Sequence, residues 1–376
     1  MHQRLVCLIT FLIVKITYCK LSTIDDVLGC RLESGELVDW YYLYKLPKES
    51  SERDSPTNGL RYTYVSSKDV AGTEGIPLQW HSARYDMNQS DSIPGRTIIP
   101  STEHPNTRLT IMYNDEPTNA PVDMERGHTK GVVSTDGING FWLIHSVPKF
   151  PPIIGVDYSY PHTGMLYGQS FLCISLDATQ METVGHQLLF NEVTVYSANV
   201  PPTLADRFPT LNRAAKMAPV DKSPPFYSQQ TVRSRAGVEF VTFAKSRHFG
   251  KELYADWIAP ALDTGLMVES WQHGTGNLPS ECSRGRRHSV LNVREVSVGR
   301  EDRFTTLKDH SKWAVGADEK GGKEEWVCVG DINRQEHQKQ RGGGSVCQAS
   351  VQVAALYRGM IDSVEPCPKV KPNGEC

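Results

Sequence analysis

Residues 126–147, RGHTKGVVSTDGINGFWLIHSV, carry the pattern around which the rest of the chain is organised. A His-x-Lys tripeptide, His128 to Lys130, precedes a short apolar run, a polar turn and a second run that begins near Trp142. Apolar runs on either side of a turn rich in Asp, Asn and Gly are typical of a β-hairpin. We therefore expect a hairpin from His128 to Val147.

The same pattern returns in the second half of the chain. The segment DHSKWAVG (309–316) contains His310 and Lys312, and a second run begins at Trp326. Residues i and i+2 of a strand point to the same face, so each copy presents an imidazole beside an ammonium. The repetition indicates an internal duplication. A third His-x-Lys, at 337–339, lies in a polar run without an apolar strand after it, and we interpret it as surface.

Two such pairs in one place would form a phosphodiesterase site that needs no metal. One histidine would attack phosphorus, the other would donate a proton to the leaving oxygen, and the lysines would hold the non-bridging oxygens. We therefore predict that His128, Lys130, His310 and Lys312 are catalytic. No pair of cysteines has the spacing of a zinc knuckle, and we expect neither a metal nor another cofactor.

The first 19 residues have the features of a secretory signal peptide. Arg4 supplies a basic start, residues 5–16 form a short apolar run, and Thr17 and Cys19 suit the small positions before a cleavage site. The run is short for a membrane span, and no other stretch approaches its length. We expect a chain without a membrane anchor that enters the secretory pathway and reaches the lysosome or the exterior.

The cysteines fit that route. The chain has 9 cysteines, and removal of Cys7 and Cys19 with the signal peptide leaves an odd number. In a secreted protein these imply disulfides, and we expect the terminal Cys376 to be the unpaired one. The sequon that starts at Asn88 is a candidate glycosylation site.

The charge of the chain depends on pH through its histidines. The formal net charge is −3 at pH 7 with histidine neutral, and there are 12 histidines. Protonation around their ordinary pKa of about 6.5 would make the chain positive in an acidic compartment. Proteins that bind a polyanion at neutral pH are usually plainly basic. The composition therefore favours work in acid over polyanion binding at neutral pH.

Other elements follow from local patterns. We place an N-terminal half at 20–200, a Pro/Ser-rich linker region at 201–237 and a C-terminal half at 238–376. The glycines at 342–344 favour a turn before the last helix over a phosphate-binding backbone. Strands are predicted over 38–46, 108–113, 170–176, 266–271 and 291–298, and helices over 183–193, 247–262 and 346–361.

Longer stretches of the chain resemble the deoxyribonuclease II family, the acid endonucleases of lysosomes. The resemblance runs from about Cys30 to Pro368, and its segments occur in the family's order. The most specific are VDWYYLYKLP (38–47), MYNDEP (112–117), RGHTKGVV (126–133), GFWLIHSVPKFP (140–151), YGQSFLCIS (167–175), FAKSRHFGKELYADW (243–257), DHSKW (309–313), WVCVGDINR (326–334) and QRGGGSVC (340–347).

The resemblance implies an α/β fold (mixed α+β) similar to that of the phospholipase D superfamily. There, two pseudo-symmetric halves, each a central mixed β-sheet flanked by helices, meet with their His-x-Lys strands facing one another. It also implies metal-independent cleavage of DNA in acid to 3′-phosphate and 5′-hydroxyl ends, for example in the clearance of engulfed apoptotic material. Position in the superfamily favours His128 as nucleophile and His310 as general acid.

The resemblance further implies supporting residues and a disulfide pattern. His145 lies where the family has a histidine, and Asn333 and the neighbouring Asp331 belong to the GDIN segment that assists the site. The implied disulfides are Cys30–Cys173, Cys282–Cys367 and Cys328–Cys347.

Two departures from the superfamily stand out. Its aspartate five residues after the lysine is absent, since Asp136 and Asp318 each come six residues after. Ala314 stands where the family often has a cysteine. Neither departure touches the four predicted catalytic residues.

Two other functions remain open at this point. A phospholipid or other phosphodiester hydrolase could use the same scaffold, although the chain lacks a membrane-binding amphipathic segment. A catalytically altered, secreted nucleic-acid-binding relative is the third reading, and the presence of both His-x-Lys pairs weighs against it. The sequence decides neither the preferred cut sites nor whether the protein is a monomer or a homodimer.

Overall fold

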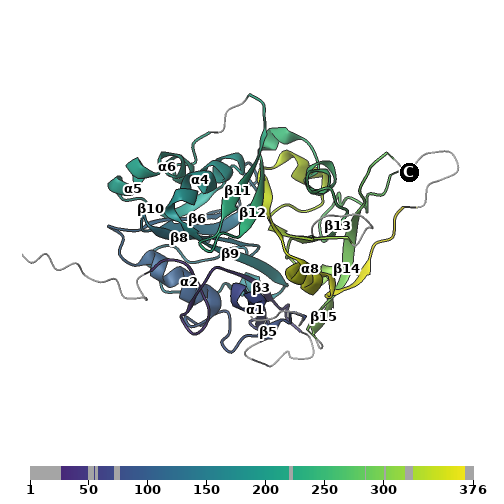
Figure 1. The fold of residues 1–376 in the computed structure, drawn as a ribbon, viewed down its shortest axis with the longest axis horizontal. Helices are drawn as coiled ribbons and strands as arrows, with labels where there is room; N and C mark the ends of the chain where they lie inside the picture. The colour runs from purple at the N-terminus through teal and green to yellow at the C-terminus, as the bar shows by residue number, and fades with distance from the viewer. Residues whose placement is uncertain are drawn as a thin grey trace, which may run out of the picture.

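The computed structural model describes residues 27–49, 55, 58–71, 77–219, 223–283, 285–299, 302–317 and 325–368. The predicted signal peptide, Asp318 and Cys376 lie outside these residues. The described chain forms two large β-sheets side by side, with helices packed against them (Figure 1). This confirms the expected mixed α/β class. Among the described residues, no helix has the length and apolar character that a membrane span requires.

The first sheet has eight strands and contains the first predicted hairpin. Its order is β10-β6-β7-β8-β9-β3-β4-β5, and the neighbouring strands are antiparallel. The hairpin is β7–β8, closed where Thr135 pairs with Gly140. The strands are β3 (Trp40–Lys45), β4 (Tyr62–Ser66), β5 (His81–Ser82), β6 (Leu109–Asn114), β7 (Lys130–Thr135), β8 (Asn139–His145), β9 (Gln169–Asp177) and β10 (Val195–Asn199).

The second sheet has nine strands and is mixed. Its order is β11-β12-β18-β17-β16-β13-β14-β15, and β19 also pairs with β14. Strands β13 and β14 run parallel, whereas the other pairs are antiparallel. The strands are β11 (Tyr227–Arg233), β12 (Glu239–Lys245), β13 (Leu266–Glu269), β14 (Val290–Val298), β15 (Asp302–Thr305), β16 (Trp313–Gly316), β17 (Trp326–Gly330), β18 (Gly343–Ala349) and β19 (Ile361–Val364).

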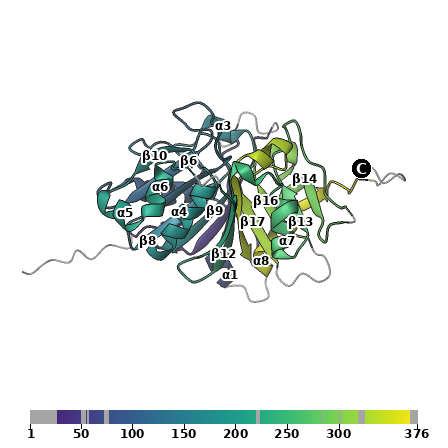
Figure 2. The same ribbon diagram turned by 90° about the horizontal axis from the view of Figure 1, so that it is seen from above.

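Five strands of each sheet follow an equivalent order. The order β6-β7-β8-β9-β3 in the first sheet corresponds to β13-β16-β17-β18-β12 in the second. One hydrophobic cluster includes Trp142 of the first sheet and Trp313 and Val327 of the second, so the two halves share a core. Figure 2 shows β9 and β17 next to one another at the junction. The junction is therefore fixed by packing, because closely packed cores resist deformation.

The helices are short. Helix α4 (Met181–Phe190) agrees with the helix predicted over 183–193. The segment 201–237, interpreted as a linker region, holds two helices and strand β11 as well as the passage between the halves. The remaining helices are α1 (Ser67–Ala71), α2 (Ile93–Thr102), α3 (His162–Met165), α5 (Pro202–Arg207), α6 (Pro209–Ala215), α7 (Ala259–Leu262) and α8 (Val351–Arg358).

The helix predicted over 247–262 is broken into three pieces. A 3₁₀ turn covers Arg247–Phe249, a π-helical turn covers Tyr254–Ile258, and α7 follows. Gly250 has a φ of 67° and ends the first turn. This left-handed conformation cannot continue a right-handed helix, so the apolar periodicity alone gave a wrong continuous helix.

The C-terminal helix predicted over 346–361 is wrong in its first residues. Strand β18 continues to Ala349, and α8 begins only after Ser350, whose hydroxyl accepts a hydrogen bond from the Val353 amide at 3.3 Å. The glycines at 342–344 do not form the predicted turn either. A Cβ atom on Gly344 would lie 1.8 Å from the carbonyl oxygen of Phe243, so glycine allows β18 to approach β12.

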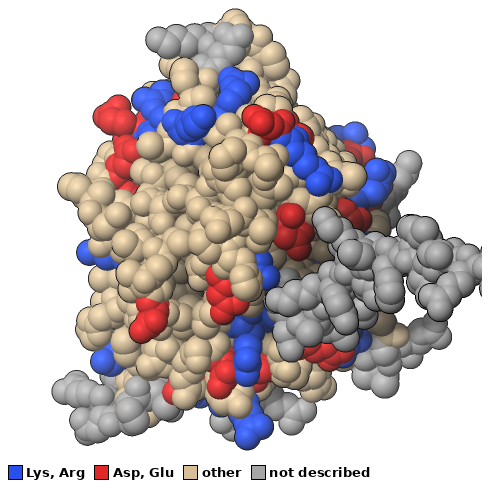
Figure 3. All heavy atoms as spheres, turned by 90° about the vertical axis from the view of Figure 1, so that its left-hand side faces the viewer, with Lys and Arg blue, Asp and Glu red and all other residues tan. Residues whose placement is uncertain are grey.

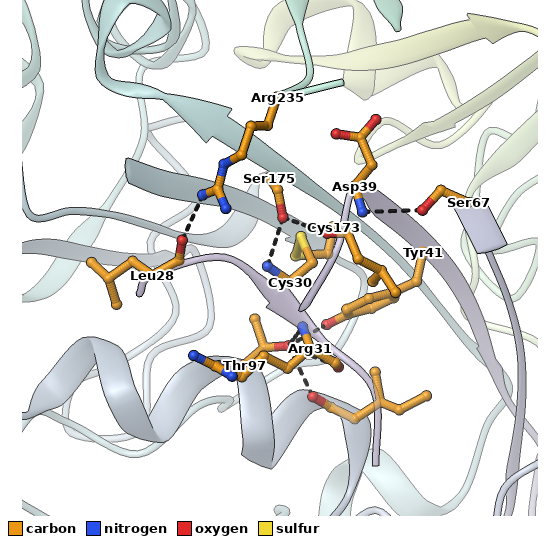
Figure 4. Close-up of a disulfide and its surroundings, with 12 residues drawn as sticks. Leu28, Cys30, Arg31, Asp39, Tyr41, Ser67, Thr97, Cys173, Ser175 and Arg235 are labelled. Carbon is orange, nitrogen blue, oxygen red and sulfur yellow. Dashed lines mark hydrogen bonds between the residues drawn. A yellow bond between two sulfur atoms is a disulfide. The ribbon is translucent and has the colours of Figure 1, made fainter. Parts of the chain in front are cut away.

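Three disulfides join the described cysteines: Cys30–Cys173, Cys282–Cys367 and Cys328–Cys347. They are the pairs that the resemblance implies. Figure 4 shows the first, which ties the ribbon of β1 (Cys30–Arg31) and β2 (Leu37–Val38) to strand β9. There the hydroxyl of Ser175 accepts a hydrogen bond from the Cys30 amide at 2.9 Å. The N-terminal ribbon is thus held by both covalent and polar bonds.

Charged side chains of both signs are interspersed around a mainly uncharged centre on the face that Figure 3 shows. Asn88 lies in an exposed turn, which suits an accessible modification site.

Candidate active site

The four predicted catalytic residues lie at the junction of the two halves. Lys130 is the first residue of β7, and His128 precedes that strand. His310 and Lys312 precede β16. Of the four residues, which were all expected on strands, only Lys130 lies on one. All four are buried, His128 at 7% and His310 at 8% exposure. The remaining accessible edge of each imidazole is small, as a reacting group in a water-poor site requires.

The first tripeptide is held by the second half of the chain. The amide of His128 donates to the carbonyl of Gly342 at 2.9 Å, and its Nδ1 lies 2.8 Å from the carbonyl oxygen of Asp331. The amide of Lys130 donates to the Asp331 carboxyl at 3.3 Å. Both contacted residues border strands β17 and β18.

The second tripeptide is held by the first half in a matching way. The amide of His310 donates to the carbonyl of Gly168 at 2.9 Å, and its Nδ1 lies 3.0 Å from the carbonyl oxygen of Ser146. The amide of Lys312 donates to the hydroxyl of Ser170 at 3.2 Å. Ser146 follows β8, Gly168 precedes β9 and Ser170 lies in β9, and these two strands are equivalent to β17 and β18. Each half therefore completes the site of the other.

These contacts decide which nitrogen of each ring is free. A carbonyl oxygen only accepts hydrogen bonds, so Nδ1 of His128 and of His310 carries the hydrogen. The Nε2 atom of each neutral ring is then the unprotonated nitrogen. It is the atom that can attack an electrophile or, once protonated, donate to a leaving group.

Acidic and basic groups surround His128. The ammonium of Lys130 is paired with the carboxylate of Asp115, and Glu116 lies 3.8 Å from the same ammonium. The Asp115 carboxylate also lies 3.3 Å from the guanidinium of Arg341 and 3.8 Å from Nε2 of His128. Asp115 was not predicted as a site residue, although its segment, MYNDEP, was part of the quoted resemblance.

The surroundings of His310 are aromatic instead. The Lys312 ammonium donates to the carbonyl of its own neighbour His310 at 2.6 Å and lies 3.2 Å from Nδ1 of that ring. The ring of Trp271 meets the His310 ring edge-on, with centroids 5.0 Å apart. By strand register, Trp271 and Asp115 occupy equivalent places. The pairs that define this register are Gly131 with Tyr113 and Trp313 with Glu269.

Burial and positive neighbours disfavour protonation of both histidines. Burial lowers the pKa of His128 well below its ordinary value, and the charges of Lys130 and Arg341 lower it further. Burial also lowers the pKa of His310, with additional effects of Lys312 and Lys130. Burial and Lys130 lower the pKa of Lys312 to about 7. The mutual influence of groups from both tripeptides shows that they share one electrostatic environment.

Lys130, Lys312 and Arg341 bring positive charge to the two imidazoles, and the carboxylates of Asp115 and Glu116 offset part of it on the His128 side. An anion placed between the two imidazoles would offset the burial of the cations and favour protonation of one ring. The arrangement can therefore bind a tetrahedral oxyanion and pass a proton across it, with a nucleophilic nitrogen on one side and an acid on the other.

The supporting residues in the GDIN segment lie in the site. Burial raises the pKa of the Asp331 carboxyl to about 8, and its backbone carbonyl holds His128 as described. The side-chain oxygen of Asn333 accepts a hydrogen bond from the Trp271 amide at 3.3 Å. Asn333 therefore acts on the position of Trp271, which contacts His310.

His145 is the last residue of β8, and its ring lies among aromatic side chains. Its ring packs against Phe150 and Phe171 at centroid distances of 5.3 and 5.6 Å, and its Nδ1 accepts from the Val147 amide at 3.2 Å. Its Nε2 has no hydrogen-bond partner among the described residues. Burial, with a contribution from Lys130, lowers its pKa to about 3. This geometry suits a neutral packing residue beneath Ser146, which it precedes.

One group among the described residues has the geometry of a metal site. Ligand atoms of Asp115, Glu116 and His128 lie within 4.8 Å of one another. The cationic side chains of Lys130 and Arg341 already contact Asp115, so a cation there would meet two positive charges. The donor set is therefore poorly suited to a resident metal.

Two buried lysines near the site were not predicted from the sequence. Lys45 ends β3 and donates to the carbonyl of Met165 at 2.9 Å, and Lys245 ends the equivalent strand β12 and donates to the carbonyls of Gln338, at 2.9 Å, and Arg341. Burial lowers the pKa of both ammoniums, that of Lys245 to about 7. Each lysine anchors the loop that leads to a glycine whose carbonyl accepts a hydrogen bond from a predicted catalytic histidine.

Glu269 is a third residue that the sequence did not single out. It is fully buried, and both its carboxyl oxygens lack a hydrogen-bond partner among the described residues. Burial and the neighbouring Asp309 raise its pKa well above its ordinary value, so the neutral acid is favoured. A neutral Glu269 leaves the charge of nearby Lys312 available to a bound anion.

Comparison with known proteins gives consistent matches over nearly the whole chain. The family model described as Deoxyribonuclease II matches residues 29–367. The chain is 36% identical to deoxyribonuclease-2-alpha of Sus scrofa, with 91% of each chain covered, and 35% identical to deoxyribonuclease-2-beta of Homo sapiens, with 90% of this chain and 92% of the relative covered. It is 33% identical to cell death-related nuclease 6 of Caenorhabditis elegans, with 90% and 89% covered.

Proposed function

Because this chain belongs to the deoxyribonuclease II family, we propose that it is an acid endodeoxyribonuclease that hydrolyses DNA phosphodiesters to 3′-phosphate and 5′-hydroxyl ends without a metal. The convergence of two His-x-Lys tripeptides in one buried, cation-rich site carries the proposal. A phosphodiester is an anion that these cations can hold, and the two imidazoles supply a nucleophile and an acid for its cleavage in two steps.

In the first step, the two lysines hold the non-bridging oxygens of the scissile phosphate. Nε2 of His128 attacks phosphorus, and the bond to the 5′-oxygen breaks as His310 donates a proton to that oxygen. In the second step, water attacks the phosphohistidine, His310 takes up a proton from the water, and the nitrogen–phosphorus bond breaks. The 3′-phosphate leaves and both rings return to their starting states. This assignment of the two histidines follows the position of each in the phospholipase D superfamily.

Acid conditions favour this cycle. The lowered pKa of both histidines means that the acid form of either ring is scarce near neutrality. The pair of histidines must hold one proton between them, and both acidification and the negative charge of the substrate favour binding of that proton. We therefore place the activity in the acidic part of the secretory pathway, the lysosome, or in the exterior after secretion. The substrate would be DNA of engulfed or dying cells, and Asn88 would carry a glycan.

The test is relaxation of supercoiled plasmid at pH 5 in excess EDTA, with His310→Ala as the control. We expect cleavage by the wild type, none by the variant, and 5′ ends that polynucleotide kinase labels without prior phosphatase treatment. A requirement for added Mg²⁺ contradicts the proposal. Hydrolysis of phospholipid vesicles without DNA cleavage would favour the lipid phosphodiesterase, and DNA binding without any cleavage would favour the altered relative.

A further inference from the structure

We propose that Tyr167, Trp271 and His273 form a stacking platform for one nucleobase beside the scissile phosphate. The proposal rests on the proposed function, since it assumes that DNA is cleaved between the two histidines. It adds a base-binding subsite on one side of that position. The platform would take any base, because every base presents a π-face.

The three rings contact one another closely. Trp271 and His273 are stacked, with centroids 4.4 Å apart and ring planes 25° apart. Tyr167 meets Trp271 edge-on at 4.6 Å and His273 at 5.9 Å. Trp271 also contacts the catalytic His310 at 5.0 Å. The rings therefore form a continuous aromatic path that begins at a reacting group.

The path leads from the buried site to the surface. His310 is buried, Tyr167 and Trp271 are partly exposed, and His273 is exposed. In the aromatic clusters of the core, by contrast, rings such as Trp313 and Tyr357 are fully buried. Rings that only fill the interior have no need to reach solvent. A partly exposed set next to the reacting group offers its apolar faces to a ligand.

The backbone holds each ring in place. Tyr167 directly precedes Gly168, whose carbonyl accepts from the His310 amide. The Trp271 amide donates to Asn333, and Nε2 of His273 is hydrogen-bonded to the carbonyl of Leu307. Rings that are already ordered lose little entropy on binding, which is the property expected of a binding surface.

Among the residues that the structure describes, the other half shows no such platform at the equivalent position. Asp115 occupies the position equivalent to Trp271, and it is surrounded by Lys130, Glu116 and Arg341 rather than by aromatic rings. The subsite should therefore receive the base on one flank of the scissile phosphate and not on the other. If His310 protonates the 5′-oxygen, that flank is the 3′ nucleoside.

The experiment measures cleavage at each phosphate of end-labelled oligonucleotides at pH 5, with and without a single abasic position. For the wild type we expect about tenfold slower cleavage at the phosphate on one flank of the abasic position, in line with the worth of one base stack. His273→Ala and Trp271→Leu should lose about tenfold on intact DNA and nothing further at the abasic flank. Removal of the base and removal of the ring that it stacks on eliminate the same contact, so the two losses are not additive.

Matched variants separate stacking from packing. Trp271→Phe keeps a ring and should retain most of the rate and the abasic effect. Tyr227→Ala removes an aromatic that is 44% exposed elsewhere in the second half and should leave every rate unchanged. Circular dichroism checks the fold of each variant.

Two results would overturn the platform. In the first, the rate loss of a variant and the rate loss caused by the abasic position multiply when the two are combined. In the second, the wild type cleaves at the same rate on both flanks of the abasic position as in intact DNA. If the wild type cleaves no DNA at all, the result contradicts the proposed function and not the platform. In that event, fluorescence anisotropy with the same oligonucleotides makes the same comparison on binding, and additive losses there would overturn the platform as well.

Discussion

The carbonyl oxygen of Asp331 lies 2.8 Å from Nδ1 of His128 and so leaves Nε2 as the unprotonated nitrogen of the neutral ring. Ser146 does the same for His310 from the opposite half of the chain, at 3.0 Å. Each histidine thus owes its orientation to a strand that lies far from it in sequence. The predictions below follow from this crossed arrangement.

Replacement of either catalytic histidine should abolish cleavage without unfolding the protein. We expect His128→Ala and His310→Ala to lose at least about a thousandfold in single-turnover rate, because nucleophile and acid act as a unit. His337→Ala, from the third and exposed His-x-Lys, is the matched control and should be fully active. More than a tenth of the activity in either site variant, with a native circular dichroism spectrum, would contradict the two-histidine mechanism.

The two lysines should matter more for turnover than for binding. Lys130→Ala and Lys312→Ala are expected to reduce kcat by about a hundredfold or more and to weaken DNA binding only a few-fold, because charge builds up in the transition state. Lys339→Ala is the control from the third tripeptide. If the site variants bind DNA weakly but turn over at the wild-type single-turnover rate, these lysines are surface charges and not catalytic groups.

Activity should peak in acid, near pH 5, and be largely lost by about pH 7.5, in buffer with EDTA. The sign follows from the lowered pKa of His128 and His310: the protonated form of the acid disappears as the pH rises through its pKa. A lowered pKa shifts that loss to lower pH. The check is kcat/KM from pH 4 to 8. An optimum above neutrality contradicts the acid mechanism.

Neutralising Asp115 should move the pH profile further into acid. In Asp115→Asn the carboxylate 3.8 Å from Nε2 of His128 is lost, so the protonated ring loses a favourable charge. Because His128 must be neutral to attack, we expect the ascending limb of kcat/KM on the acid side to shift to lower pH. Glu125→Gln, a change at an exposed carboxylate, serves as the charge-matched control. An unchanged limb would mean that the two neighbouring cations already cancel the charge of Asp115.

Lys245 should leave a signature in stability rather than in chemistry. Its folded pKa is about 7 against an ordinary value of about 10.5, so folding disfavours the charged form. Burial of the charged ammonium therefore costs stability in full below pH 7, and this cost falls as the pH rises from 7 towards 10.5. The charged groups that act on it are Glu252, Glu192 and Arg341. In Lys245→Met, thermal unfolding temperatures should rise less over this range than in the wild type, and parallel profiles would disprove the assignment.

The hairpin β7–β8 could be predicted because its signals are local. An Asp-Gly turn between two apolar runs needs no distant partner to be recognised, and the same is true of the His-x-Lys repeat. Pattern and resemblance together therefore supply the mixed α/β class and the position of the candidate catalytic residues. The mutual distances within the site were beyond the sequence, because they depend on how the two sheets meet.

Other features depended on contacts that no local pattern contains. Lys45 and Lys245 look like polar ends of strands, and only the packing of loops over them makes them buried anchors. The glycines at 342–344 have the composition of a turn, yet Gly343 and Gly344 begin strand β18 because they pair closely with β12. Trp271 looked like a residue at the end of a strand, and its proposed role emerges from its contact with His310 and from the register that makes its position equivalent to that of Asp115.

The crossed backbone contacts also bear on how the protein is made. His128 depends on the carbonyls of Asp331 and Gly342, which lie near the carboxyl end of the chain. A ribosome must therefore finish almost the entire polypeptide before the first histidine acquires its support. Nascent chains and products of premature stop codons would carry an intact first motif and yet be inert. Incomplete chains of this deoxyribonuclease would therefore not cleave the DNA of the cell that synthesises them.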